Sequence, residues 1–391
     1  MERIIKMLVV HAKIYTMADS GVIEDGFILT NGQKIKGIGS MSSCDNYEDQ
    51  EDIVDVHGMH LFPGFIDAYT SMGSNCVDNF EGQSGHEHLI APHLRVIDSI
   101  DSQDSSFKEA LSSGVTSVAV SQINTRLISG QISAIKTYGE KIDDMILNPL
   151  VAVRFSLSQD SDIFLNNISK SKISFAAVIR EELLKAKKYI EDKEFAISNL
   201  DRFETPVYNI KYESLVDLLE KNIPTYIDVN TKDEIFTAMR IAKEFSIGSV
   251  LINPLEAHML AEELLADNIS VLCAPFSGGN KNYENCGSVA KIPGILTKSR
   301  VPTAIVSAHP KTPSSYLLFA AAIAVKEGMD RMEAIKSVTI YPAKICNIQN
   351  RVGSIEIGKD ADFSAFLKHP LDSLEKPKLV VCNGEKVVFN L

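Results

Sequence analysis

Residues 61–73 read Leu61-Phe62-Pro63-Gly64-Phe65-Ile66-Asp67-Ala68-Tyr69-Thr70-Ser71-Met72-Gly73. Apolar residues lead up to Asp67, and the preceding residues 55–60 are rich in turn formers. A short apolar run bounded by turn signals is typical of a buried strand in a parallel sheet. After Asp67 the chain becomes small and polar, and a (β/α)₈ barrel keeps its chemistry at that end of each strand. We therefore expect residues 61–67 to form a barrel strand with a site at its C-terminal end.

The composition is ordinary for a soluble globular protein, and the charge balance limits the classes of binding partner that we expect. The chain has 391 residues, 45% hydrophobic and 23% charged, so it can bury a large core. Its formal net charge of −12, without a long Lys/Arg run, predicts no nucleic-acid partner. No stretch approaches the roughly 20 apolar residues of a membrane span. The charged N-terminus does not resemble a signal peptide, and six scattered cysteines indicate reduced thiols. We expect a cytoplasmic protein.

Both ends of the chain are rich in short strands. Residues 26–39 and 379–388 each place an Asn-Gly pair between apolar runs, which is the strongest short-range hairpin signal. Each end is too small to bury a core alone. We therefore predict one small composite β-sandwich domain formed by residues 1–58 and 351–391.

Between the ends, strand and helix patterns alternate, which favours an α/β fold with parallel strands and crossover helices. With residues 61–67 there are eight strand candidates, the number that a closed barrel needs. Residues 59–350 are therefore predicted to form a (β/α)₈ TIM barrel. The other seven candidates are Val115–Val120, Gln131–Ile135, Val151–Phe155, Thr225–Val229, Ser249–Asn253, Val271–Ala274 and Thr303–Ser307.

Several segments resemble the amidohydrolase superfamily, in the same order along the chain. Residues 61–71 are similar to its first barrel strand, P-G-F-I-D-x-H-x-H, and residues 353–362 to its G-S-I-E-x-G-K-x-A-D signature. Within the superfamily the resemblance is to a group related to imidazolonepropionase and prolidase-like hydrolases. The segments that carry it are Pro92-His93-Leu94-Arg95-Val96-Ile97-Asp98, Ser129–Gly139, Glu256-Ala257-His258 and His309-Pro310.

The resemblance implies zinc or another divalent metal that activates water for hydrolysis of a carbon–nitrogen bond. In the family the ligands lie at strand ends: an H-x-H pair, a lysine, two further histidine positions and an aspartate. Carried over by position, none of these ligands is present in this chain. The matching residues are Tyr69 and Ser71 for the first pair, Arg154 for the lysine, Asp228 and Asn230 for the strand-five segment, Asn253 for the strand-six histidine and Ala308 for the aspartate.

These replacements are poor metal donors. Zinc takes three or four nitrogen, sulfur or carboxylate donors, whereas Arg154 keeps its positive charge and Ala308 offers no donor at all. We expect Arg154 to form an ion pair with Asp228. The alternative is a new site built from the oxygens of Asp228, Asn230 and Asn253, which would suit magnesium or calcium better than zinc.

For the remaining histidines and one glycine pair, we expect a structural role rather than a metal or ligand site. His258 and His309 do not stand at ligand positions, so we interpret them as neighbouring or packing residues rather than as a residual two-histidine site. His86-Glu87-His88, with His93 nearby, lacks the H-E-x-x-H spacing; it indicates a solvated cluster, with adventitious nickel or zinc binding as the alternative. Ser277-Gly278-Gly279-Asn280 indicates a flexible loop, the alternative being an anion-binding concavity.

The sequence therefore predicts a divergent amidohydrolase-superfamily protein without catalytic residues of the family type and without a metal cofactor. Its barrel mouth would persist as a pocket for a small-molecule ligand. The first alternative is an active hydrolase of cyclic amides or peptides with a rebuilt metal site. The second is a structural subunit that partners an active homologue. The resemblance also implies a homo-oligomer.

Overall fold

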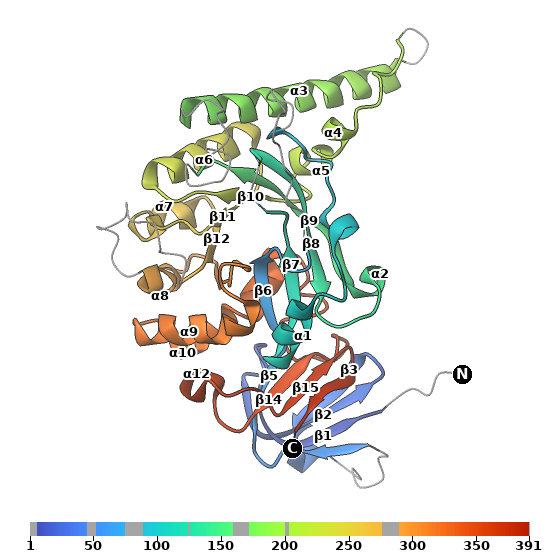
Figure 1. Cartoon of the computed structure of the whole chain (residues 1–391), viewed down its shortest axis with the longest axis vertical. Helices are drawn as coiled ribbons and strands as arrows, with labels where there is room; N and C mark the ends of the chain where they lie inside the picture. Colours follow the sequence, from blue (N-terminus) through green and yellow to red (C-terminus); the bar gives the residue numbers. More distant parts are fainter. Residues whose placement is uncertain are drawn as a thin grey trace.

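We describe the protein from a computed structural model, which describes residues 6–44, 52–74, 89–123, 126–158, 172–199, 203–275 and 289–390. It contains two eight-stranded sheets, one at the end of the molecule that holds the first and last strands and one inside the helical body (Figure 1). The His86–His88 cluster and Ser277–Asn280 lie outside the described residues. In the part of the chain that is described, no helix is long and apolar enough to cross a membrane.

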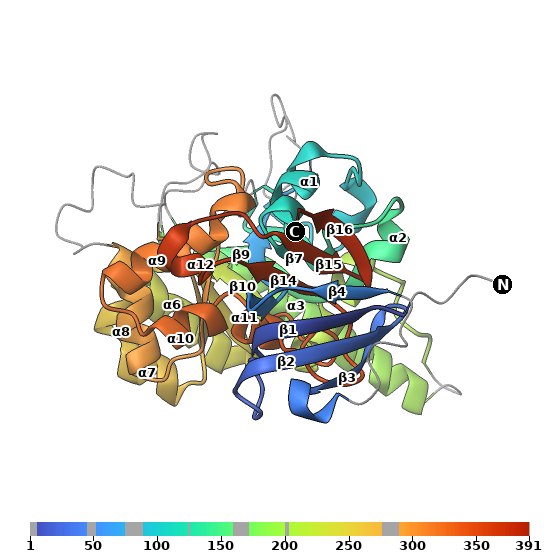
Figure 2. The same cartoon turned by 90° about the horizontal axis from the view of Figure 1, so that it is seen from below.

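Strands from both chain ends share the terminal sheet, in the order β16-β15-β14-β5-β1-β2-β3, with β4 paired to β1. The central pairing joins β5 to β14 in antiparallel register, with Leu61 opposite Ala365. Figure 2 shows β1 to β3 nearest the viewer. The two chain ends therefore pair in one sheet, as predicted, whereas a sandwich of two sheets and the domain boundaries stay predictions. The strands are β1 Leu8–Tyr15, β2 Val22–Asn31, β3 Lys34–Ser40, β4 Ile53–Asp55, β5 His60–Pro63, β14 Phe363–Phe366, β15 Leu379–Cys382 and β16 Glu385–Phe389.

The second sheet runs in the order β6-β7-β8-β9-β10-β11-β12-β13 and is nearly closed. All seven strand candidates beyond residue 73 overlap its strands, and β7 has the predicted bounds. The mixed α/β fold with an eight-stranded barrel sheet is therefore as predicted. The strands are β6 Phe65–Thr70, β7 Val115–Val120, β8 Ile128–Lys136, β9 Ile146–Ser156, β10 Thr225–Asp228, β11 Ser249–Ile252, β12 Ser270–Cys273 and β13 Thr303–Ile305.

Two details of the predicted barrel are wrong. Residues 61–67 are not one strand, because Gly64 separates β5 of the terminal sheet from β6 of the barrel sheet. A Cβ at Gly64 would lie 2.1 Å from the Thr116 hydroxyl oxygen, so only glycine fits at this crossing. In addition, β8 is antiparallel to both β7 and β9. The links before and after β8 are too short for the crossover of a dozen or more residues that parallel neighbours need.

Helices surround the barrel sheet, with α3 outermost at the end opposite the terminal sheet (Figure 1). At the start of α6, the hydroxyl of Thr231 and the carboxylate of Glu234 form a capping box, which satisfies backbone N–H groups there. The α-helices are α1 Ser105–Ser112, α2 Ile142–Met145, α3 Lys172–Ser198, α4 Ile210–Glu213, α5 Val216–Leu219, α6 Lys232–Phe245, α7 Ala261–Ala266, α8 Ile292–Lys298, α9 Leu317–Lys326, α10 Arg331–Lys336, α11 Ile340–Ile345 and α12 Pro370–Ser373. Short 3₁₀ turns are η1 Met41–Ser43, η4 Val96–Ser99, η6 Ala257–Met259, η7 Val289–Lys291 and η8 Ser314–Tyr316.

A buried lysine joins the two sheets. Lys136 ends β8, its side chain is 1% exposed, and its Nζ lies 3.0 Å from Asp360 Oδ2 and also contacts Asp362. Burial alone would lower the pKa of Lys136, but the two carboxylates raise it above the usual value. Lys34 and Arg351 bind the same Asp360 from the rim, at 2.6 and 2.9 Å. Every charge in this cluster is therefore paired, which offsets the cost of burying it.

Replacing Lys136 with alanine should destabilise the protein by about 3–5 kcal/mol, because two buried carboxylates lose their cation. Lys34→Ala is the matched control: it removes a lysine from the same Asp360, but its side chain is 51% exposed, so we expect about 1 kcal/mol or less. Urea unfolding of the three proteins measures both values. Equal losses from the two variants would contradict the role given to Lys136.

Candidate barrel-mouth site

Arg154 lies near the C-terminal end of a barrel strand, at the barrel mouth. It lies on β9 with a side chain that is 3% exposed, and its Nε donates to Asp228 Oδ2 of β10 at 2.7 Å. Its Nη1 donates to the Ser121 hydroxyl at 3.2 Å and to the carbonyl of Gln122 at 2.5 Å. The predicted ion pair is therefore confirmed. It forms because β9 and β10 are parallel neighbours, with Asp228 paired to Ser156, two residues beyond Arg154.

Tyr69 packs against the same guanidinium. The Arg154 Cζ lies 5.1 Å from the centre of the Tyr69 ring, within cation–π range. Burial raises the pKa of the Tyr69 phenol, while Arg154 acts in the opposite direction, so the hydroxyl stays protonated at neutral pH. Burial would lower the pKa of Arg154, but Asp228 and Tyr69 raise it. The result is a rigid phenol–guanidinium–carboxylate array in which the Asp228 side chain is 15% exposed.

Other predicted residues have structural partners. Ser71 binds the carbonyl of His309 twice, through its N–H at 3.1 Å and its hydroxyl at 2.8 Å, which ties the ends of β6 and β13 together. The Asn230 amide donates to the Ser158 hydroxyl at 2.7 Å, and its backbone N–H donates to Glu234 at 2.7 Å.

Asn253 and Ala308 share a strained backbone. They follow β11 and β13 and have φ values of +50° and +56°. The left-handed conformation costs a residue with a Cβ about 1–2 kcal/mol, and such strain gathers at functional sites. Ten other described non-glycine residues also have positive φ, so this conformation alone does not mark a site, and Ala308 has no functional side chain.

The two predicted histidines do not form a site with each other. His309 lies near Asp104 and Glu109, at α1, and burial lowers its pKa while these carboxylates raise it. His258 lies in η6, which packs against α6 and α8. The Nδ1 atoms of both are buried and, among the described residues, have no hydrogen-bond partner.

Sequence reasoning missed a buried carboxylate that helps to close the barrel. Asp67 is fully buried in β6 and accepts hydrogen bonds from the Ser307 N–H at 3.2 Å, the Ser307 hydroxyl and the Ser314 hydroxyl at 2.8 Å. These bonds connect β6 to the end of β13, where few backbone bonds join the two strands directly. A lone aspartate within an apolar strand was the signal, since a buried carboxylate needs partners.

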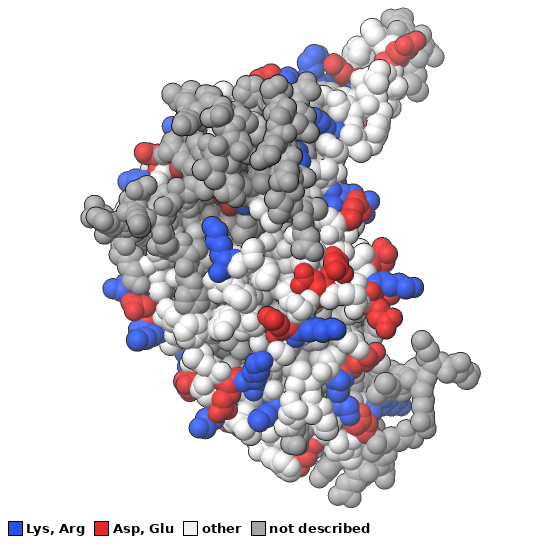
Figure 3. All heavy atoms as spheres, viewed as in Figure 1, with Lys and Arg blue, Asp and Glu red and all other residues white. Residues whose placement is uncertain are grey.

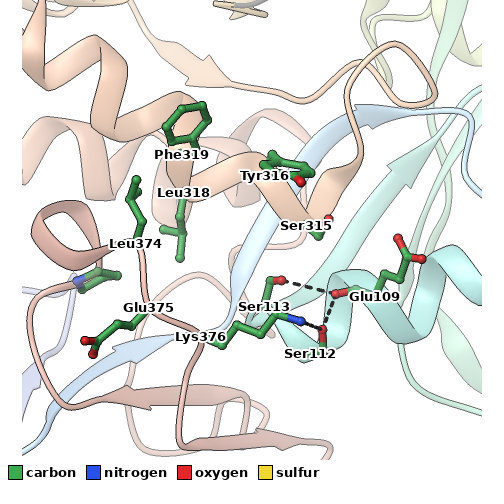
Figure 4. Close-up of a pocket in the computed structure, with 11 residues that line it drawn as sticks. Glu109, Ser112, Ser113, Ser315, Tyr316, Leu318, Phe319, Leu374, Glu375 and Lys376 are labelled. Atoms are coloured by element: carbon green, nitrogen blue, oxygen red, sulfur yellow. Dashed lines mark hydrogen bonds between the residues drawn. The ribbon is translucent and has the colours of Figure 1, made fainter.

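One surface cavity is separate from this site. It measures about 530 Å³ and lies between the end of α1, the start of α9 and the segment after α12 (Figure 4). Two of its hydroxyls are used internally, since Ser112 and Ser113 both donate to the carbonyl of Glu109. None of the predicted site residues lines it. Among the described residues on the face shown in Figure 3, acidic and basic side chains are intermixed without a basic stripe.

The residues at the barrel mouth do not fit a catalytic divalent ion. Such an ion needs about three donors and an open position. Arg154 presents a permanent positive charge there, Asp228 already binds that charge, and Ala308 presents a methyl group. Within the described ranges, no group of three or more His, Cys, Asp or Glu side chains is arranged to hold a metal ion.

Comparisons with known proteins agree on one family. The amidohydrolase family model matches residues 308–387. Imidazolonepropionase of Acinetobacter baumannii is 24% identical over 420 residues, covering 94% of this chain and 95% of that protein. The crystal structure of an amidohydrolase from Thermotoga maritima is 28% identical with a TM-score of 0.88, covering 98% of this chain and 100% of that one. A Xaa-Pro dipeptidase with methionine in its active site, at 14% identity, a TM-score of 0.56 and the same coverage, shares the fold.

The pKa of Asp67 makes stability depend on pH. Burial raises it from 3.8 to about 6, although the hydrogen bonds from Ser307 and Ser314 lower it. The folded protein therefore binds this proton more tightly than the unfolded chain does. The contribution to stability is fully present below pH 3.8 and is lost as the pH rises through 6, by on the order of 3 kcal/mol.

Asp67→Asn should remove this pH dependence. We expect the unfolding free energy of the unmodified protein, minus that of the variant, to fall as the pH rises from 4 to about 7. Urea unfolding at several pH values measures the difference and cancels the other titrating groups. Parallel profiles for the two proteins would show that Asp67 is ionised in the fold throughout.

Proposed function

This chain belongs to the amidohydrolase superfamily, and we propose that it is a divergent member that binds a small molecule at its barrel mouth without metal-dependent hydrolysis of carbon–nitrogen bonds. The observation that supports this most directly is the Arg154–Asp228 ion pair, at 2.7 Å, at the positions where the family places metal ligands. Relatives that carry the names imidazolonepropionase and Xaa-Pro dipeptidase indicate the ancestry of the pocket.

The ion pair opposes a metal for an electrostatic reason. Two unit charges 4 Å apart interact with about 4 kcal/mol at the dielectric of a protein surface, and a divalent ion roughly doubles that repulsion. Arg154 cannot escape by deprotonation, because a guanidinium keeps its proton in proteins. Asp228 would have to give up Arg154 to serve as a ligand, which leaves a buried cation unpaired. The free-energy cost of binding a metal here therefore exceeds the stabilisation that one new contact would contribute.

The array suits a ligand that carries N–H groups beside an acceptor atom. The partly exposed Asp228 carboxylate accepts hydrogen bonds, and the Arg154 guanidinium supports it from below. The Tyr69 ring packs against Arg154 within cation–π range. An amide or a small nitrogen heterocycle fits this combination, whereas a phosphate or a free carboxylate would be repelled by Asp228.

An active hydrolase with a rebuilt metal site is the second candidate. It is favoured by the similarity to imidazolonepropionase over 94% of the chain. The contacts weigh against it, since Asp228 is bound to Arg154 and the Asn230 amide to Ser158. A purely structural subunit is the third candidate, and ligand binding at the mouth separates it from the first.

Protein purified without a histidine tag should contain far less than one zinc, manganese or iron per chain. It should not hydrolyse dipeptides or cyclic amides at a rate that depends on added metal, because the donor set is missing. Ser71→His should not rescue metal binding, since one imidazole cannot replace the other donors. Elemental analysis and metal-titrated assays test this. Stoichiometric metal that is lost in Asp228→Ala would establish the rebuilt hydrolase instead.

A panel of cyclic amides and nitrogen heterocycles should contain compounds that raise the thermal unfolding temperature. A ligand at 100 times its Kd stabilises the folded state by about 2.7 kcal/mol. Asp228→Asn should abolish the shift for the same compounds, because the amide places an N–H donor where the carboxylate accepted, while Asp143→Asn, on the exposed surface of α2, should keep it. Shifts unaffected by Asp228→Asn would place binding elsewhere, and no shift would favour the structural subunit.

A further inference from the structure

The outer face of α3 carries a continuous stripe of exposed residues at alternating steps of four and three. The inner face of the same helix is buried, with Ile179, Leu183 and Ala186 in the core. Steps of four and three form the heptad seam by which one helix packs against another. We call this stripe the α3 seam; its seven residues, all exposed, are Ala177, Glu181, Leu184, Lys188, Glu191, Phe195 and Ser198.

The α3 seam and the segment after it gather exposed apolar side chains. Leu184 and Phe195 of the seam are 55% and 54% exposed. The rings of Phe195 and Phe203 meet edge-on, 5.0 Å apart, and beyond them Val207 and Tyr208 are 90% and 71% exposed. Single exposed apolar residues are common, but a gathered patch marks an interaction surface.

We propose that the α3 seam binds the α3 seam of a second copy of this chain, in antiparallel orientation. A two-fold axis between Tyr189 and Ile190 would place Leu184 of one copy opposite Phe195 of the other. The same axis would place Lys188 opposite Glu191. Leu184 thus meets Phe195 and Lys188 meets Glu191, each twice across the axis, while Glu181 faces the uncharged Ser198. Such self-complementarity is what an isologous two-fold interface requires.

The charge distribution favours a second copy over an unrelated partner. Residues 172–213 contain eight Lys and Arg and eight Asp and Glu, so this segment is neutral. The rest of the chain has 31 basic and 43 acidic residues, from totals of 39 and 51, and therefore carries the whole net charge of −12. Two copies that meet through α3 avoid the repulsion between their acidic bodies. The seam also lacks the single-sign charge that would select a basic or acidic partner.

The position of α3 leaves room for this contact. Its 27 residues correspond to a helix about 40 Å long, on the outside of the body opposite the terminal sheet (Figure 1). Lys188 pairs at 3.0 Å with Asp192 of its own helix, but both side chains are exposed. An exposed pair of this kind contributes little, so Lys188 can turn to Glu191 of the second copy at low cost.

Reversing the charges of Lys188 and Glu191 tests the proposed two-fold interface. Sedimentation velocity should show the unmodified chain as a dimer. In Lys188→Glu, the new glutamate of each copy faces Glu191 of the other. In Glu191→Lys, the new lysine of each copy faces Lys188 of the other. Because like charges then face each other, each variant should raise the dimer dissociation constant at least about tenfold. The double variant should restore the dimer. An equimolar mixture of the two single variants should form a heterodimer, because every facing pair is then of opposite sign.

The controls separate the seam from general effects. Lys36→Glu makes the same charge change on β3, at the far end of the molecule, and should leave the dimer intact. Leu184→Asp should give a monomer, and circular dichroism should show all variants folded, because the altered residues are exposed. A monomeric unmodified chain, a dimer that survives both reversals, or a failure of the mixed variants to associate would overturn the proposal.

Discussion

The buried Lys136 is the interaction on which the arrangement of the two sheets depends. Its ammonium group lies at the end of a barrel strand, while the carboxylates of Asp360 and Asp362 belong to the chain as it returns to the terminal sheet. An unpaired charge at this depth would cost several kcal/mol, so the barrel strand and the returning segment must meet in one geometry. The backbone N–H of Asn383 binds the second oxygen of Asp362 at 2.9 Å and extends this constraint to the last hairpin.

Charge pairing and hydrogen bonds hold the barrel mouth together. Arg154 places a permanent positive charge there, and Asp228 neutralises it. Asn253 and Ala308 have left-handed backbones at the strand ends. Side chains take part in closing the barrel, since Asp67 accepts hydrogen bonds from Ser307 and Ser314. On the proposed function this array binds a small molecule, whereas metal-dependent hydrolysis would need about three donors and an open position.

Sequence patterns predicted where strands lie along the chain better than they predicted the direction of each strand in its sheet. The strand at 115–120 has its predicted bounds, because β-branched residues and flanking turns mark both ends. The Arg154–Asp228 contact was predictable because both residues stand at strand-end positions that converge in a barrel. The antiparallel direction of β8 was not, since a periodicity of two is the same in either direction. The role of Asp67 depends on Ser307 and Ser314, which are distant in sequence and carry no signal of their own.

The central place of β5 in the terminal sheet sets the order of events during synthesis. Its partner β1 is made first, but its other partner, β14, leaves the ribosome roughly 300 residues later. At about 5–20 residues per second, β5 would wait on the order of 15–60 s with one edge unpaired. An unpaired edge invites pairing with another nascent chain. The N-terminal strands therefore reach their final sheet only after translation is nearly complete, which makes this region the one that a holding chaperone would have most reason to shield.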